Sequence, residues 1–270
     1  MSLPSFLSCL SRAFPLIALV ATTPLAAHEF WIEPVSHSVE PGDEIVASLR
    51  VGQNYDGETF PYLSSRFERF IVTDASGTRG YRGHEGDQPA IETEATEPGL
   101  TVLTYVSTPS TLVYRKWDTF LNYTTNEGLI GAVEAHRAAG LPETGFSEDY
   151  QRHAKALIQV GPVDPAARET AQRLDLELVA LGNPFDPEAE TLRVRLLRFG
   201  EPAPDVQIAI FRKTGGETQV EKLRTDSGGH AEIALEDGVL YLLNAVVLER
   251  SEDDDADWES DWASLTFARP

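Results

Sequence analysis

Short apolar segments separated by turn residues make up most of the chain. The segments at residues 30–53, 69–83 and 97–108 are rich in β-branched and aromatic residues, and Pro, Gly or Asp residues punctuate each of them. Within the second segment, the sequence Asp-Ala-Ser-Gly at residues 74–77 has the composition of a hairpin turn. Short strands at this spacing predict a β-sandwich.

A helical interruption is expected after these strands. Thr124 and Glu127 have the spacing of a capping box, and the apolar residues at positions 129, 130 and 133 would share one face of the helix that follows. Gly140 and Pro142 would end it. Residues 147–162 suit either a strand or a short helix, and we favour the strand.

The second half of the chain returns to a β pattern. Residues 163–173 form a polar linker or a short helix, and six β-type segments follow them. In the segment at 191–199, Leu192, Val194 and Leu196 alternate with Arg193 and Arg195, as in a strand with one buried face. The sequence therefore predicts a mainly β protein with two β-sandwich domains, Ig-like or transthyretin-like, at residues 28–173 and 174–270. The helical insertion lies near the end of the first.

The amino-terminal segment, residues 1–27, has the features of a secretory signal peptide. An apolar run at 13–26 follows Arg12 and ends in small residues, so cleavage is expected after Ala27 or after Ala26. An uncleaved anchor is the alternative, although the run is short for a membrane span. The only cysteine, Cys9, leaves with the signal. We expect a periplasmic or secreted protein with no stable membrane span after cleavage.

The charge balance restricts the partners. The chain has 22 basic and 43 acidic residues, a formal net charge of −21, and therefore repels nucleic acid and anionic membrane surfaces. Cations are its natural partners, although such a charge also serves solubility alone. The acidic run at 251–257 begins with the spacing of an EF-hand, but Trp258 stands where glycine is needed and Ser264 where glutamate is needed. A solvated loop is the preferred interpretation.

Catalytic motifs are missing from the sequence. It contains no G-x-S-x-G nucleophile elbow, and the segment beginning at His28 starts like H-E-x-x-H but has Ile32 in the last position. We therefore predict that the protein is not an enzyme, with no catalytic or cofactor-binding residues.

Several motifs occur in a recognisable order along the mature chain. They are HEFWIEP at 28–34, VGQ at 51–53, NEGL at 126–129, YQRHAKALIQVG at 150–161, LELVALGNPF at 176–185, TDSGG at 225–229 and DWESDWASLTF at 257–267. The set resembles a family of secreted bacterial proteins of undefined function, loosely associated with nickel or cobalt transport in the periplasm. The second half also resembles transthyretin-like or carboxypeptidase-regulatory modules, which are usually accessory.

The chemistry of the sequence centres on His28. If cleavage follows Ala27, the α-amine and Nδ1 of His28 can close a chelate ring on a transition metal ion such as nickel, cobalt, copper or zinc. In an extended strand Glu29 would face away from His28. His37 and His84 are therefore the candidates that would complete the metal site. We expect His136 and His153 to be exposed surface residues and His230 to begin a strand.

Three functions remain open at this point. The first is a periplasmic metal-binding accessory protein that serves an envelope transporter or receptor. The second is a non-catalytic structural module of the cell envelope. The third, a copper-dependent oxidase built on a histidine brace, would need a second histidine beside His28. We favour the first.

Overall fold

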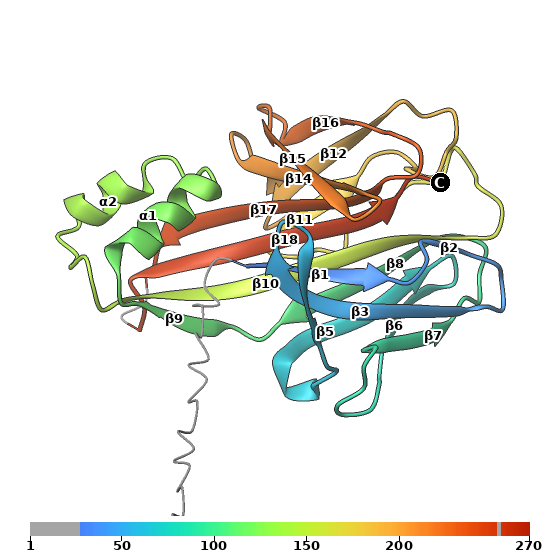
Figure 1. Ribbon diagram of the computed structural model, residues 1–270, viewed down its shortest axis with the longest axis horizontal. Coiled ribbons are helices and arrows are strands. Elements are labelled where there is room, and N and C mark those ends of the chain that lie inside the picture. Colours follow the sequence, from blue (N-terminus) through green and yellow to red (C-terminus); the bar gives the residue numbers. More distant parts are fainter. Residues whose placement is uncertain (1–27, 253–254) are drawn as a thin grey trace, which may run out of the picture.

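A ten-stranded sheet runs through the molecule and contains strands from both halves of the chain (Figure 1). The computed structural model describes residues 28–252 and 255–270. The order of the main path is β15-β14-β17-β18-β10-β8-β5-β6, and β2 and β9 also pair with β10. Two four-stranded sheets accompany it, one formed by β1, β3, β4 and β7 and the other by β11, β12, β13 and β16. The predicted mainly β fold of the sandwich type is confirmed.

The elements of the first half run as follows: β1 Glu29–Pro34, β2 Ser38–Val39, β3 Glu44–Gln53, β4 Asp56–Phe60, a 3-10 turn at Ser64–Arg66, β5 Phe67–Asp74, β6 Gly77–Gly80, β7 Ile91–Glu94, β8 Gly99–Ser107, β9 Ser110–Tyr114, α1 Trp117–Asn126, α2 Ala132–Ala138 and β10 Phe146–Val160. Those of the second half are β11 Leu176–Ala180, β12 Thr191–Arg198, β13 Glu201–Pro202, β14 Gln207–Thr214, β15 Glu217–Arg224, β16 His230–Ala234, β17 Leu240–Arg250 and β18 Trp258–Ala268.

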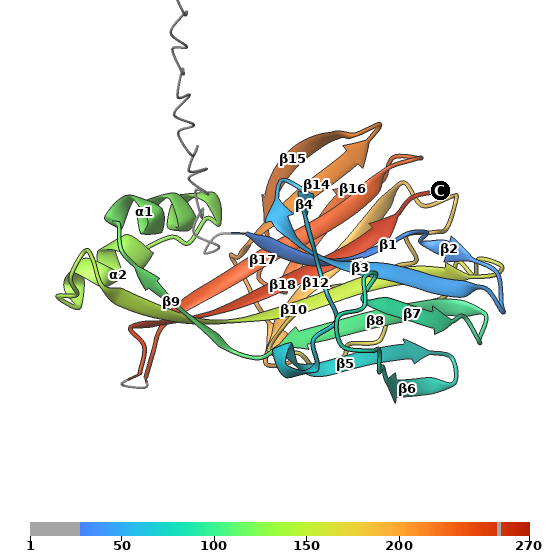
Figure 2. The ribbon, with the colours of Figure 1, turned by 60° about the horizontal axis from the view of Figure 1, so that its bottom comes forward.

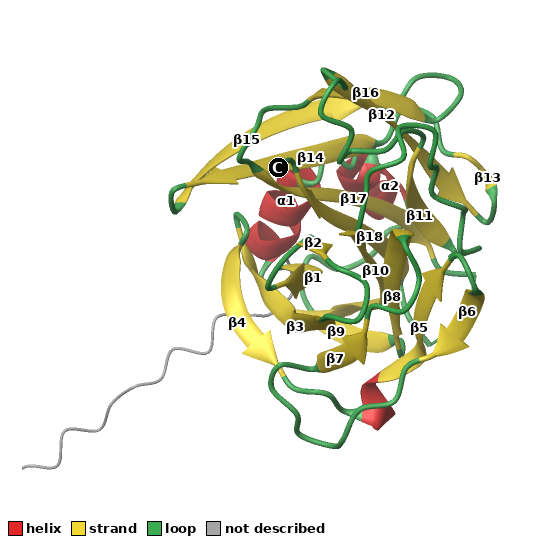
Figure 3. Cartoon of the chain, turned by 90° about the vertical axis from the view of Figure 1, so that its right-hand side faces the viewer, coloured by secondary structure: helices red, strands yellow, loops and turns green. Residues whose placement is uncertain are grey.

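The central sheet is covered on opposite faces by the two smaller sheets, as the end-on view in Figure 3 shows. Ala154, Ala156 and Ile158 of β10 belong to the core that includes β1 and β3. Leu157, on the other face of the same strand, belongs to the core that includes β11 and β12. Strand side chains alternate between faces, so one continuous apolar run serves both cores.

The two halves are joined within this sheet. β10 pairs with β18 in parallel over nine residues, from Glu148↔Trp258 to Ala156↔Thr266. The boundary predicted near residue 173 falls in the connection between β10 and β11. Strands from both sides of this boundary nevertheless belong to one hydrogen-bonded sheet. The linker at 163–173 contains neither helix nor strand.

A buried ion cluster holds that linker against the sheet. Lys155 donates hydrogen bonds to Glu169 and to Glu177, the latter at 2.7 Å, and all three side chains are at most 1% exposed. The remaining carboxylate oxygens accept backbone N–H groups, including that of Ala180 at 2.7 Å. A buried charge is tolerable only when it is paired and hydrogen-bonded, as it is here.

The helical prediction is wrong in its boundaries. The helices lie together at one end of the sheets (Figure 2), but α1 begins at Trp117, and Thr124 lies in its last turn, where its hydroxyl donates to the carbonyl of Leu121. Gly128 and Gly131 have φ of 64° and 82°, a conformation that ends α1 and delays α2 until Ala132.

Two histidines predicted to be exposed are buried. His136 is fully buried, where its Nε2 bonds to the carbonyl of Pro142 and its Nδ1 accepts from the indole of Trp258. His153 is 2% exposed and pairs with Asp261. Trp258 and Trp262 share a core with Phe120 and Tyr123 of α1, and His230 begins a strand, as predicted.

The predicted signal peptide, residues 1–27, and positions 253–254 of the acidic run lie outside the described residues. None of the helices in the described ranges is both long and apolar enough to cross a membrane.

Candidate metal centre at the amino-terminal strand

The start of β1 is held rigidly between two cores. Trp31 and Ile32 are fully buried, and β1 pairs with β3 from Glu29↔Gly52 to Pro34↔Ala47. The Trp31 ring meets Tyr55 edge-on with centroids 5.5 Å apart. Both faces of the strand are therefore packed, because Phe30 and Ile32 enter one core and Trp31 enters another. His28 enters the structure at a fixed point.

A two-residue turn places polar groups beside that point. Asn54 and Tyr55 have φ of 56° and 59° between the paired residues Gln53 and Asp56, as in a type I′ hairpin. Tyr55 turns its ring onto Trp31, while Asn54 and Gln53 line a cavity of about 260 Å³ next to Glu29. The local sequence thus makes one end of β1 polar and keeps the rest apolar.

The cavity contains two carboxyl groups. Glu29 comes from β1 and Glu127 from the end of α1, and Asn126 and Lys222 complete much of the polar lining. The Lys222 ammonium donates to the carbonyl of Asn126 at 2.8 Å. Glu127 accepts from the amide of Asn244 at 3.4 Å, whereas Oε2 of Glu29 is buried without a hydrogen-bond partner among the described residues.

The electrostatics of this cavity favour an added cation. Burial raises the pKa of Glu29 to about 7, and the neighbouring Glu127 carboxylate raises it as well. Burial also raises the pKa of Glu127 to about 7, against the opposing effect of Lys222. Two carboxylates that share a poorly solvated cavity are destabilised by each other, so a cation placed near them is stabilised.

His28 has an unused ligand atom. Its Nδ1 is buried and makes no hydrogen bond within the described ranges. The His28 carbonyl accepts a long hydrogen bond, 3.4 Å, from Arg152, whose guanidinium also lies over the Tyr150 ring, 4.8 Å from its centroid. Arg152 and Tyr150 line a second, smaller cavity of about 130 Å³ together with Phe30. The backbone of His28 is therefore held by Arg152, while its Nδ1 has no hydrogen-bond partner among the described residues.

The structure does not bring the other two predicted ligands to His28. His37 lies beyond the far end of β1, where it is 5% exposed and its Nδ1 bonds to the Leu157 carbonyl at 2.8 Å. Burial lowers the pKa of His37 to about 4. The side chain of His84 is 95% exposed in the loop between β6 and β7, 3.4 Å from Asp87. Within the described ranges, no group of three metal-ligating side chains includes His28, His37 or His84.

Sequence reasoning missed the polar cavity beside Glu29. A strand turns the Glu29 side chain away from His28, and the spacing of Thr124 and Glu127 predicts only a helix cap. The signal was nevertheless present in the motifs. The VGQ segment contributes Gln53, the NEGL segment contributes Asn126 and Glu127, and all three line the cavity beside Glu29. The YQRH segment contributes Tyr150 and Arg152 to the other cavity.

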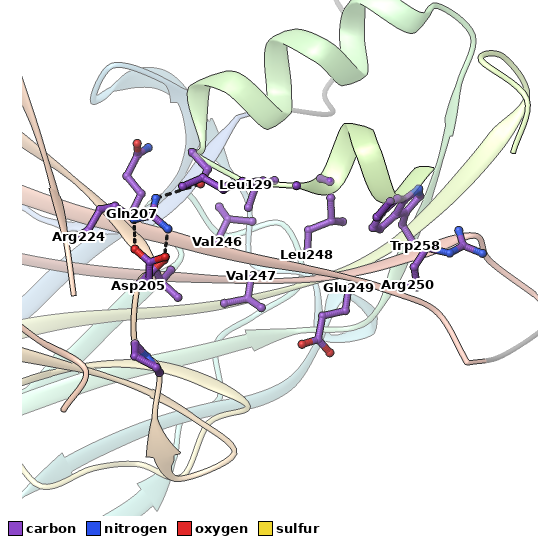
Figure 4. Close-up of a pocket in the computed structure, with 17 residues that line it drawn as sticks. Leu129, Asp205, Gln207, Arg224, Val246, Val247, Leu248, Glu249, Arg250 and Trp258 are labelled. Atoms are coloured by element: carbon purple, nitrogen blue, oxygen red, sulfur yellow. Dashed lines mark hydrogen bonds and ion pairs between the residues drawn. The ribbon is translucent and has the colours of Figure 1, made fainter. Parts of the chain in front are cut away.

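A larger groove of about 480 Å³ lies between the α1–α2 connection and β17 (Figure 4). Leu129, Val246 and Leu248 give it an apolar floor, and the polar groups at its rim are already paired: Arg224 contacts Asp205 at 2.5 Å, and Gln207 donates to the Asn126 carbonyl at 2.7 Å. It offers a metal ion no free ligand set. The amino-terminal cavity is the better candidate centre.

Comparison with known proteins gives a family but no activity. The family model for a domain of unknown function (DUF4198) matches residues 25–249. No curated protein sequence matches the chain.

Among solved structures, the D0-D1 domain of intimin is 10% identical, with a TM-score of 0.20, and the alignment covers 88% of this chain and 97% of that one. A tetra-tandem repeat of a large adhesion protein is 11% identical, with a TM-score of 0.20 and coverages of 90% and 50%. Trypsin-activated alpha-2-macroglobulin from Escherichia coli is 12% identical, with a TM-score of 0.24 and coverages of 93% and 16%.

Proposed function

The chain belongs to the DUF4198 family, and we propose that it is an exported, non-catalytic protein that binds a transition metal ion at its mature amino terminus. One observation carries the proposal. His28 and Glu29, the first two residues expected after cleavage, each have a buried polar atom with no partner among the described residues: Nδ1 of His28 and Oε2 of Glu29. Buried polar atoms are rarely left unpaired unless a ligand, water or ion completes them.

The ligand set follows from the chemistry of a free histidine terminus. Cleavage after Ala27 would free the α-amine of His28, which loses its proton near neutral pH, and this nitrogen and Nδ1 can chelate one ion. Nitrogen ligands suit copper, nickel, cobalt and zinc better than calcium or magnesium. The carboxylates of Glu29 and Glu127 would supply the negative charge that balances a divalent ion.

The biological role that best fits such a site is capture and transfer. Trp31 and Ile32 anchor the amino-terminal strand, and the exposed residues Gln53 and Asn54 line part of the cavity beside Glu29, the residue after His28. An ion held there stays accessible to an envelope transporter or receptor. The net charge of −21 would draw cations toward the protein.

Calorimetric titration of the processed protein with copper, nickel, cobalt and zinc tests the proposal. We expect tight binding of at least one ion, accompanied by proton release. His28→Ala should abolish the tight phase without unfolding the chain. Glu127→Gln should weaken it by about tenfold, the scale of a partner outside the ligand shell.

The exposed histidine provides a matched control. His84→Ala removes an imidazole that lies in another loop and should leave the titration unchanged. Equal affinity in the His28→Ala and His84→Ala variants would rule out the amino-terminal site. No binding in any variant would favour the scaffold function.

A further inference from the structure

A separate group of metal-ligating side chains lies where the linker between the two halves meets the central sheet. His153 projects from β10 and Asp261 from β18, and Asp175 directly precedes β11. One ligand atom from each of the three lies within 4.8 Å of the others, and this is the one such group in the described ranges. We propose that these three side chains bind a divalent transition metal ion, and that the ion fastens the linker to the sheet.

The spacing of the ligand atoms fits a metal ion. His153 Nε2 and Asp261 Oδ1 are 3.2 Å apart. Nitrogen and oxygen ligands lie about 2.0–2.2 Å from zinc, so two neighbouring ligands at 90–110° are roughly 3.0–3.5 Å apart. The third ligand, at no more than 4.8 Å, needs only a small movement of an exposed side chain. Asp175 is exposed and can make that movement.

The two aspartate carboxylates also favour the binding of a cation. The Asp175 carboxylate forms no hydrogen bond or ion pair with any described residue, and His153 is the sole partner of the Asp261 carboxylate in the same ranges. A protonated His153 could neutralise one of the two carboxylates but not both. Lys155, two residues further along the same face of β10, is already shared by Glu169 and Glu177. A divalent ion would balance the charge of both aspartates.

The ligand types indicate the class of ion. One imidazole and two carboxylates suit zinc, manganese, cobalt or nickel, and such a set leaves one or more positions for water. The site joins the parallel strands β10 and β18 to the first residue before β11. A bound ion would therefore cross-link segments about 90 residues apart in sequence and act chiefly on stability.

Thermal unfolding with added zinc is the test. It uses the chain carrying one extra residue ahead of His28, so that the amino-terminal chelate cannot form and the outcome is independent of the proposed function. Zinc at a hundredfold excess over its Kd should raise Tm by roughly 5–10 °C. Asp175→Asn should abolish the shift while leaving the metal-free Tm nearly unchanged, because the side chain is exposed and unpartnered among the described residues.

Two further variants make the result specific. Asp261→Asn should abolish the zinc shift as well. Asp118→Asn, at another exposed aspartate on α1, should keep it. Absence of a zinc shift in the parent protein, or an undiminished shift in Asp175→Asn, overturns the proposal.

Discussion

Replacing Lys155 by methionine should destabilise the protein strongly and in a pH-dependent way. The substitution keeps the length and most of the volume of the side chain but removes the cation shared by Glu169 and Glu177. Burial already raises the pKa of Glu169 in the presence of Lys155. Without the ammonium, at least one of these fully buried carboxyl groups must take up a proton on folding.

The free energy needed to protonate this carboxyl group sets the size of the destabilisation. The ordinary carboxyl pKa is 4.5, so protonation at pH 7 costs about 3.4 kcal/mol, since each pKa unit is worth about 1.4 kcal/mol. At pH 5 the same step costs only about 0.7 kcal/mol. The deficit relative to the unsubstituted protein should therefore be about 3 kcal/mol at pH 7 and less than 1 kcal/mol at pH 5. The variant loses stability as the pH rises, because its folded state binds one proton more than its unfolded state.

Urea unfolding followed by tryptophan fluorescence at both pH values measures this deficit. Arg198→Met serves as the control, because its ion pair with Glu249 is exposed and should contribute less than about 1 kcal/mol. The double variant with Glu169→Gln should recover part of the lost stability by removing one buried charge. A deficit below 1 kcal/mol at pH 7, or one that does not change with pH, would refute this reasoning.

Three other substitutions test separate parts of the structure. The unsubstituted protein should lose about 3 kcal/mol of stability as the pH falls from 6.5 to 4, because His37 binds a proton in the unfolded state but not in the buried folded state. His37→Asn should remove this pH dependence. Identical urea unfolding curves for the two proteins across this range would contradict the prediction. Gly57→Ala should destabilise the β3–β4 hairpin by about 1–3 kcal/mol, because an added Cβ would lie 2.3 Å from the Val51 carbonyl oxygen; an unchanged Tm would count against it. Tyr114→Phe should lower the free energy of unfolding by about 1–3 kcal/mol, because the buried Glu148 carboxylate loses a hydrogen-bond donor at 2.5 Å. A negligible change in chemical denaturation would contradict this prediction.

The alternation of apolar and polar residues was sufficient to locate most strands. It gave the hairpin around residues 74–77 and the one-sided burial of β12, because each depends on local periodicity alone. It failed for β15, whose sequence ETQVEKLR is polar on both faces. β15 lies at the edge of the sheet and is held by main-chain hydrogen bonds to β14. The pattern of apolar and polar side chains does not predict such pairing.

The site depended on information that is not local. The parallel pairing of β10 with β18 joins residues about 110 apart, and it buries His153, whose charged neighbours in the sequence suggested an exposed position. Those neighbours are themselves enclosed, since Lys155 is paired with two glutamates and Arg152 stacks on Tyr150. Likewise, only the folded chain brings Glu127 into the cavity beside Glu29.

The most direct measurement compares copper affinity in two proteins that differ by one residue. One is processed so that it begins at His28, and the other carries Ala27 ahead of it, which converts the chelating amine into an amide while every side chain stays in place. We predict tight binding and proton release for the first protein and loss of both in the second. Equal affinity in the two proteins would contradict the claim that the mature terminus is a metal ligand.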